Sequence, residues 1–74
     1  MNRLSILRTQ SNLTQLQLAK LTDSSRRTIQ NIESGQTIPN VGLALKIAKV
    51  LNTTVEDLFS DYITETEGVE SKNE

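Results

Sequence analysis

Four polar side chains in the middle of the sequence are of the types that read nucleic-acid bases: Arg26, Arg27, Gln30 and Asn31. Arginine can donate two hydrogen bonds to the O6 and N7 atoms of guanine, and an Asn or Gln amide can pair with N6 and N7 of adenine. On a helix with about 100° per residue, Arg27, Gln30 and Asn31 project away from Ile29 and Ile32, and Arg26 lies on the flank. The pattern therefore predicts base-edge recognition by one face of a helix. The alternative is an ordinary solvated surface; we favour contact for the two arginines and leave Gln30 and Asn31 open.

The elements that must position these residues are two short helices joined by a turn. Between Thr14 and Gly35, the non-helical residues 22–25 separate two helical patterns. Thr14 followed by Gln17 is a capping box, Ser24 or Ser25 can cap the second helix, and Gly35 can end it. This spacing is typical of a helix-turn-helix, whose second helix enters the major groove. Helix N-termini attract phosphate. The residues at the N-termini of these two helices are therefore candidate phosphate contacts: Thr14, Gln15 and Ser25.

Three further helices are expected around this pair. The first runs over 2–11, with Leu4, Leu7 and Ser11 on one face. Pro39 disfavours helix at the residue before it, and Asn40 can cap a helix that extends to about residue 51. That helix is apolar nearly all round, which predicts that it is the buried centre of the bundle. After a stop at Asn52, a short helix opens at 54–57.

The faces expected to point into the core follow from the same patterns. In the helix that begins at Thr14, the inward residues are Leu18, Ala19 and Thr22. In the next helix they are Ile29 and Ile32, and in the last they are Val55, Leu58 and Phe59. The sequence thus predicts an all-α fold of five helices.

Length and composition restrict the function classes. The 74 residues suffice for one domain with a modest core. The chain has no Cys and no His, so we expect no disulfide, no metal site, no cofactor and no catalytic residues. No apolar run approaches the roughly 20 residues of a membrane span, and the N-terminus lacks the apolar segment of a signal peptide. A cytoplasmic protein is expected.

Charge divides the chain into two parts. Residues 1–60, the expected domain, carry seven Lys and Arg against four Asp and Glu. Residues 61–74 carry one Lys against five Asp and Glu, so they form an acidic tail. We expect 64–74 to be disordered and 62–64 to form a short extended strand. The tail either keeps the chain soluble, shields the basic face or contacts a partner; composition does not separate these alternatives.

The motifs together resemble the Cro/repressor-type helix-turn-helix family, also called the XRE family. The resemblance rests on residues 13–19 and 25–35, continues in 39–51 and 55–59, and covers about 2–59. It implies a five-helix, lambda-repressor-like domain that binds double-stranded DNA at a palindromic operator as a homodimer. The implied dimer contact is the 52–59 region, with Tyr62 and Ile63.

The resemblance also implies roles for single residues. Positions matching Arg26, Arg27 and Asn31 usually contact bases in this family. Positions matching the following residues usually contact phosphates: Gln15, Ser25, Ser34 and Asn40. Arg8 and Glu33 match a common ion pair between the first and third helices.

Two departures from the family pattern concern loops. The turn usually reads Gly-Val-Ser, whereas this chain has Asp23-Ser24-Ser25. The glycine is normally left-handed, a conformation that Asp tolerates better than most residues, but the apolar Val is lost. The loop before Pro39 also lacks the basic residues of many relatives, which predicts a modest affinity or a stronger dependence on dimerisation.

The sequence thus favours a transcriptional regulator, most simply a repressor. A second hypothesis is a protein-interaction module, such as an adaptor, that would use an apolar patch around Leu16 and Leu21. An enzyme is disfavoured because no catalytic constellation is present.

Overall fold

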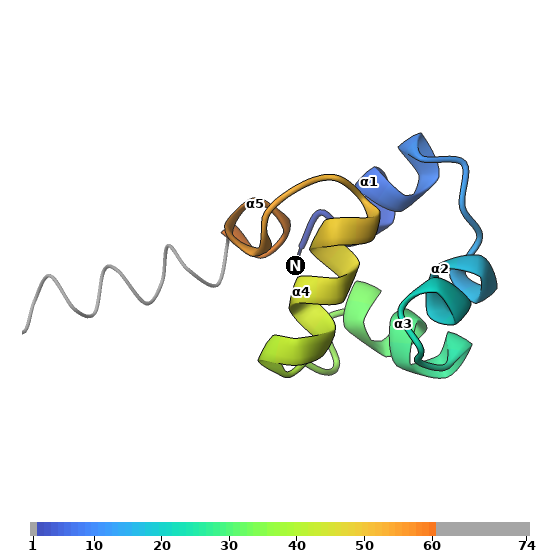
Figure 1. Ribbon diagram of the computed structural model, residues 1–74. Coiled ribbons are helices and arrows are strands. Elements are labelled where there is room, and N and C mark those ends of the chain that lie inside the picture. The colour runs from blue at the N-terminus through green and yellow to red at the C-terminus, as the bar shows by residue number, and fades with distance from the viewer. Residues whose placement is uncertain (1, 61–74) are drawn as a thin grey trace, which may run out of the picture.

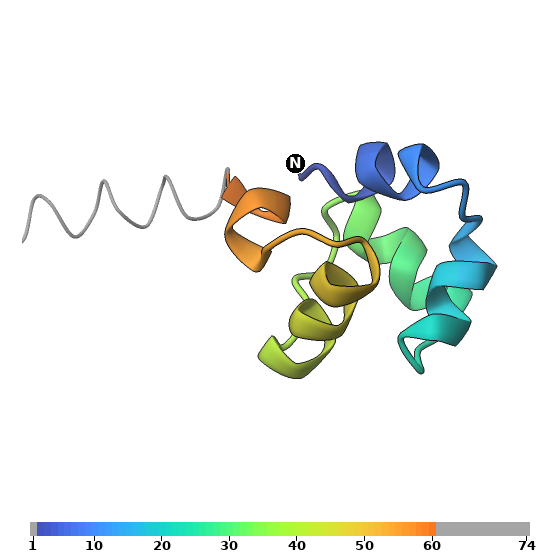
Figure 2. The same cartoon turned by 45° about the horizontal axis from the view of Figure 1, so that its top comes forward.

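The computed structural model describes residues 2–60, and within that range the chain forms five α-helices and no strand (Figure 1). They are α1 (Leu4–Gln10), α2 (Gln15–Leu21), α3 (Arg26–Glu33), α4 (Val41–Val50) and α5 (Val55–Leu58). In both views, α2 and α3 pack together at one end of the domain and α5 lies at the other (Figures 1 and 2). The predicted five-helix, all-α fold is confirmed. The strand expected at 62–64 and the acidic tail of 61–74 lie outside the described residues.

Side-chain caps set where α2 and α3 begin. Thr14 Oγ1 accepts from the backbone N–H of Gln17 at 3.0 Å, and Gln17 Oε1 accepts from the N–H of Thr14 at 2.8 Å. This is the predicted capping box, which satisfies two N–H groups that have no helical acceptor. Ser25, rather than Ser24, caps α3 by accepting from the N–H of Thr28 at 3.1 Å.

Side chains and one glycine also set the remaining boundaries. Asn40 and Thr54 cap α4 and α5, accepting from the N–H groups of residues 43 and 57. Beyond α3, Gly35 takes a φ of 84°. This left-handed residue lets Gln36 N–H bond back to Asn31 O at 2.9 Å, and such a reversal ends a helix. The predicted stop at Asn52 is also left-handed, with a φ of 57°.

The first helix is shorter than the expected 2–11. It begins at Leu4 because Asn2 is used as a bridge: Asn2 Oδ1 accepts from Leu4 N–H at 3.0 Å, and Asn2 Nδ2 donates to Ile32 O at 2.8 Å. The N–H of Arg3 donates to Leu58 O at 3.0 Å. The N-terminal residues therefore connect the ends of α3 and α5. Ser11, expected on the inward face, follows α1 and is exposed.

The core is built from aliphatic side chains of all five helices, together with Phe59. Leu4, Leu18, Ile29, Ile47 and Leu58 are each 0% exposed, and Ile32 is 1% exposed. The predicted inward orientation of the two α3 isoleucines is confirmed. Because these two side chains face inward, the opposite side of α3 faces solvent.

The prediction that α4 is buried nearly all round is wrong. Only Ala44, Ile47 and Ala48 of this helix are buried, whereas Val41 is 74% exposed and Leu45 is 57% exposed. The physical reason is the small number of elements: α2 and α5 make the main contacts with α4, and Val41 and Leu45 lie on a side that the described residues leave exposed. An apolar surface is left open along α4.

The turn between α2 and α3 accommodates the two residues that differ from the usual Gly-Val-Ser, Asp23 and Ser24. Asp23 has a φ of 58°, so the expected left-handed residue is present. Ser24 Oγ lies 3.0 Å from Oγ1 of Thr22, which is 1% exposed. A polar contact to a buried hydroxyl therefore occupies the place where the family has an apolar side chain.

The left-handed conformation makes position 23 sensitive to the residue type. Asp23→Gly should raise the free energy of unfolding by about 1 kcal/mol and Asp23→Val should lower it by about 1–2 kcal/mol, because a Cβ is strained in this region and a β-branched one most of all. Asp23 makes no side-chain hydrogen bond within residues 2–60, so the glycine variant loses no such contact there. Urea denaturation followed by circular dichroism measures both variants. Ser24→Gly is the control and should not stabilise the domain; equal stability of the Gly and Val variants at position 23 would contradict the prediction.

Candidate nucleic-acid interface

The outer face of α3 carries polar side chains with unused hydrogen-bonding capacity. Arg26, Arg27 and Gln30 are exposed, and their side chains make no hydrogen bond or ion pair with another residue in the range 2–60. Asn31 is half-buried, with its side-chain amide likewise unbonded within this range. The four predicted base readers thus lie on one short helix, with their donors and acceptors available to a ligand.

Electrostatics within the described range also favour an anionic ligand. Arg3 pairs with Asp57 at 2.6 Å, and Arg8 pairs with Glu33 at 2.5 Å. Among residues 2–60, five cations lie outside these pairs: Lys20, Arg26, Arg27, Lys46 and Lys49. Only two carboxylates in this range lie outside them, Asp23 and Glu56. The unpaired cations outnumber the unpaired carboxylates, and this excess of positive charge attracts the negatively charged phosphates of a nucleic acid.

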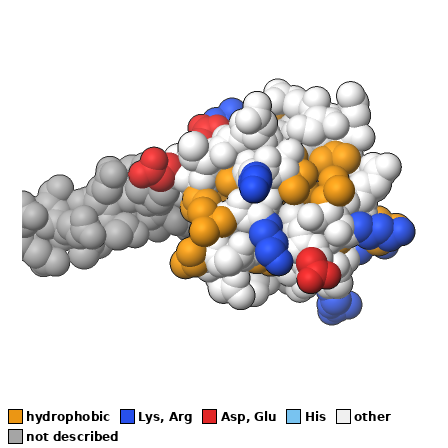
Figure 3. Space-filling view, viewed as in Figure 1, with side chains coloured by type: hydrophobic (Ala, Val, Ile, Leu, Met, Phe, Trp, Pro, Cys, Tyr) orange, Lys and Arg blue, Asp and Glu red, His pale blue; other side chains and the backbone are white. Residues whose placement is uncertain are grey.

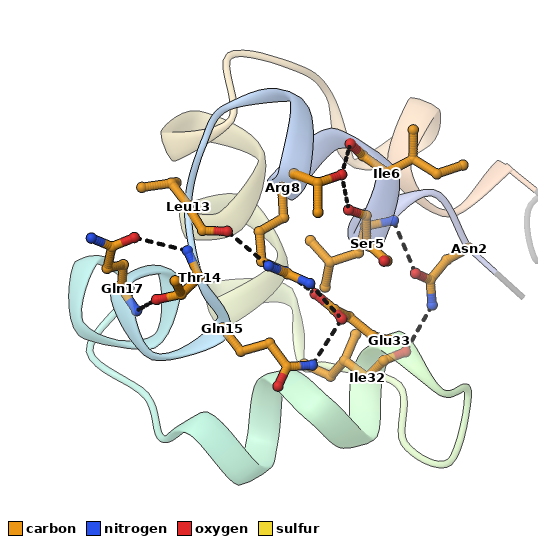
Figure 4. Close-up of polar contacts among 12 residues, drawn as sticks. Asn2, Ser5, Ile6, Arg8, Leu13, Thr14, Gln15, Gln17, Ile32 and Glu33 are labelled. Atoms are coloured by element: carbon orange, nitrogen blue, oxygen red, sulfur yellow. Dashed lines mark hydrogen bonds and ion pairs between the residues drawn. The ribbon is translucent and has the colours of Figure 1, made fainter.

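A charged network holds α3 against α1 and α2. Arg8 Nε donates to Glu33 Oε2 at 2.5 Å and Arg8 Nη2 donates to Oε1 at 3.3 Å, while Arg8 Nη1 donates to Leu13 O at 2.7 Å (Figure 4). The side chains of Arg8 and Glu33 are 13% and 9% exposed. The network links α1, the loop after it and the last residue of α3, so it fixes the position of α3.

Gln15 belongs to the same network, a role that the sequence did not indicate. Its Nε2 donates to Glu33 Oε1 at 3.0 Å (Figure 4). A Gln at the start of a helix resembles any capping residue, and only the packing of α2 on α3 reveals its partner. The backbone N–H groups of Gln15 and Leu16 have no acceptor within the described range. A phosphate contact at position 15 would use that backbone N–H or the second amide hydrogen.

The other expected phosphate contacts differ in what they can still donate. Thr14 Oγ1 accepts its cap bond, which leaves the hydroxyl hydrogen to donate. Asn40 Oδ1 accepts from Leu43 N–H at 2.8 Å, which leaves both Nδ2 hydrogens. Ser25 Oγ lies 2.9 Å from Thr28 Oγ1. Ser34 Oγ already donates to Asn31 O at 3.1 Å, so it must rotate before it can reach a phosphate.

Comparison with known proteins agrees with this geometry. A family model described as helix-turn-helix matches residues 4–58, which contain all five helices. The chain belongs to the XRE-type helix-turn-helix family. This family membership identifies a DNA-binding regulator rather than an enzyme.

Several relatives of this chain are named HTH-type transcriptional regulators. An uncharacterised HTH-type transcriptional regulator of Methanocaldococcus jannaschii, MJ0272, is 47% identical over 58 residues, which are 78% of this chain and 88% of the relative. One from Archaeoglobus fulgidus is 42% identical over 57 residues, 77% of this chain and 80% of the relative. YgzD of Bacillus subtilis is 34% identical over 58 residues, 78% of this chain and 88% of the relative.

The described part of this helix-turn-helix domain has neither a metal-binding cluster nor a membrane-spanning helix. Between residues 2 and 60, no group of three or more Asp, Glu, His or Cys residues is placed to hold a metal ion. In the same range, no helix is long and apolar enough to cross a membrane.

Proposed function

We propose that the protein is a sequence-specific transcriptional repressor that binds a palindromic operator as a homodimer, with α3 in the major groove. One observation carries this proposal: the isoleucine face of α3 is buried, while its arginine and amide face is exposed without partners in the described range. A duplex supplies the acceptors and donors that this face lacks.

Base contacts are assigned to α3 and phosphate contacts to the residues around it. Arg26, Arg27, Gln30 and Asn31 read base edges. The N-terminal residues of α2 and α3 and the loop before α4 hold the backbone, through Thr14, Gln15, Ser25, Ser34 and Asn40. Occupying the operator excludes competing proteins from the same DNA, so repression needs no activity beyond binding. The site of action is the cytoplasm.

Selection from a random DNA pool tests the operator. We expect the enriched sites to have two-fold symmetry, with half-site centres separated by about 10 base pairs, because two α3 helices of a symmetric dimer enter successive major grooves about 34 Å apart. Enrichment of asymmetric sites would exclude the homodimeric arrangement. Failure to enrich any site, together with binding that does not weaken as salt rises, would instead favour the protein-interaction alternative. Leu16 and Leu21, which are 49% and 59% exposed, are available for that role.

Arg27 should contribute both affinity and sequence preference. Arg27→Ala should weaken operator binding by about 1–3 kcal/mol and relax the preference at one base pair of each half-site, because a bidentate arginine–guanine contact is lost. Gel shifts on the selected site and on single-base variants measure both effects. Lys20→Ala removes the same charge from the last turn of α2 and is the control. It should leave the sequence preference unchanged. If Arg27→Ala also kept the wild-type preference, Arg27 would not be a base reader.

A further inference from the structure

The side-chain amide of Asn2 links the segment before α1 to the last turn of α3. Asn2 Nδ2 donates to Ile32 O at 2.8 Å, and Asn2 Oδ1 accepts from Leu4 N–H at 3.0 Å (Figure 4). The oxygen and one hydrogen of this half-buried amide are therefore both used. One side chain thus caps the start of α1 and also holds the end of α3.

The bond to Ile32 O is not needed to satisfy a buried group. Ile32 O also accepts from Gly35 N–H at 3.1 Å, and the Ile32 side chain is packed in the core at 1% exposure. Without Asn2, the carbonyl would keep one hydrogen-bond donor, which is what a buried carbonyl requires. The bond is therefore better explained by its effect on the orientation of α3 than by a need for one more hydrogen bond.

The last turn of α3 is held from two directions. The side chain of Glu33 is bonded by groups from α1 and α2. The carbonyl of Ile32 is bonded by Asn2, and the residue after Asn2 donates its N–H to Leu58 O of α5 at 3.0 Å. In Figure 4 the two sets of bonds reach the end of α3 from opposite sides. The end of the helix cannot move toward one of them without lengthening a bond to the other, so its tilt is fixed.

A tilt at this end of α3 would displace the base readers at the other end. Arg27 precedes Ile32 by five residues, so it lies about 7.5 Å away along the helix axis at a rise of about 1.5 Å per residue. A tilt of about 8° about the last turn would therefore move Arg27 by about 1 Å. Hydrogen-bond lengths vary over only about 0.5 Å, so a bidentate contact to a base would be weakened.

We propose that Asn2 is a positioning residue for DNA recognition, whose bond to Ile32 O sets the tilt at which α3 presents its outer face to the operator. This inference rests on the proposed function of α3. It adds a residue that acts through the helix rather than by contacting DNA itself. Sequence patterns placed residue 2 in the first helix and indicated no part for it in recognition.

The variant Asn2→Asp separates the two bonds of this side chain. The carboxylate keeps an acceptor for Leu4 N–H, and the dipole of α1 favours a negative charge at that helix's start. It cannot donate to Ile32 O, and both that carbonyl and the negative end of the α3 dipole repel it. Ser5→Asp is the matched control. Ser5 is exposed in the first turn of α1 and gains the same charge without replacing a bond to α3.

Gel shifts of the full-length variants on the selected operator and on a random duplex measure specificity. We expect Asn2→Asp to bind the operator about tenfold more weakly than Ser5→Asp, which is at the lower end of the range for one bidentate base contact. The two variants should bind the random duplex equally, because that binding depends on phosphates. The Lys and Arg side chains that project from the end of the domain where α2 and α3 lie are unchanged (Figure 3).

Two results of the gel shifts would overturn the positioning role. Equal operator affinities of Asn2→Asp and Ser5→Asp would show that the bond to Ile32 O does not affect recognition, and would leave the DNA-binding proposal standing. A parallel loss of affinity for both duplexes, with a smaller folded fraction in urea denaturation, would show that Asn2 only stabilises the fold.

Residual dipolar couplings of the backbone N–H groups test the tilt without DNA. The couplings of residues 26–33 should change together in Asn2→Asp relative to those of α1 and α4, and they should not change in Ser5→Asp. Unchanged couplings in α3 would overturn the positioning role whether or not the chain binds an operator. Changed couplings in a chain that binds no DNA would show that Asn2 sets the tilt of α3, and would refute the repressor instead.

Discussion

Replacing Arg8 with Met should lower the free energy of unfolding by about 3–5 kcal/mol, the expected loss when one partner of a buried ion pair is removed. The variant leaves the Glu33 carboxylate, whose side chain is 9% exposed, with Gln15 Nε2 as its remaining hydrogen-bond donor in the described range. It also removes the donor to Leu13 O. A domain of this size rarely has more than about 3–5 kcal/mol of stability. We therefore expect Arg8→Met to be largely unfolded at 25 °C.

The chain provides its own control for that experiment. Arg3 forms an ion pair with Asp57, but the two side chains are 46% and 45% exposed. Arg3→Met should therefore lower stability by less than about 1 kcal/mol, because water screens an exposed pair. The double variant Arg8→Met/Glu33→Leu should recover most of the loss, since it leaves no unpaired charge. Urea denaturation measures all three, and equal transition midpoints for Arg8→Met and Arg3→Met would show that burial of the Glu33 network contributes little.

Truncation of Ile29 should have the second large effect, a loss of about 2–5 kcal/mol for Ile29→Ala. Ile29 is 0% exposed and anchors α3 in the core, so the substitution leaves a cavity beneath the recognition helix. The expected result is a fall in melting temperature, together with weaker DNA binding as the folded fraction decreases.

Ile6→Ala is the matched control for this substitution. Ile6 is 52% exposed on α1, so the same chemical change should alter stability by less than about 1 kcal/mol. Thermal unfolding followed by circular dichroism compares the two variants. If both lost the same stability, the isoleucine face of α3 would not be its buried face, and the outward orientation of Arg27 would lose its physical basis.

Local sequence was sufficient to predict where α2, α3 and α4 begin and where α3 ends, but not where α1 begins. Thr14, Ser25 and Asn40 bind N–H groups within three residues of themselves. Gly35 and Asp23 take left-handed conformations that few other residue types tolerate. These effects act over one turn of the chain. Their residue types therefore indicated the local structure without knowledge of the packing.

The spacing of apolar residues was sufficient to predict the orientation of α3, but it was not sufficient to predict how much of α4 is buried. Two isoleucines three residues apart define one apolar stripe on α3, and it is buried. In α4, apolar residues surround the helix, and such a pattern cannot distinguish burial by the same chain from burial by another. The expectation that α4 is the buried centre of the bundle was wrong for that reason, because the exposure of its apolar side depends on how many other helices are available to cover it.

The sequence by itself determined the five helices, their caps and the polar outer face of α3, because each depends on residues within a few positions of one another. Tertiary structure alone decided that Gln15 bonds to Glu33 across 18 positions and that Asn2 bonds to Ile32 O across 30 positions. It also decided that Ile38, Val41 and Leu45 border an open groove with α5. Contacts between residues distant in sequence depend on how the helices pack, and that packing is a property of the whole core rather than of any local pattern.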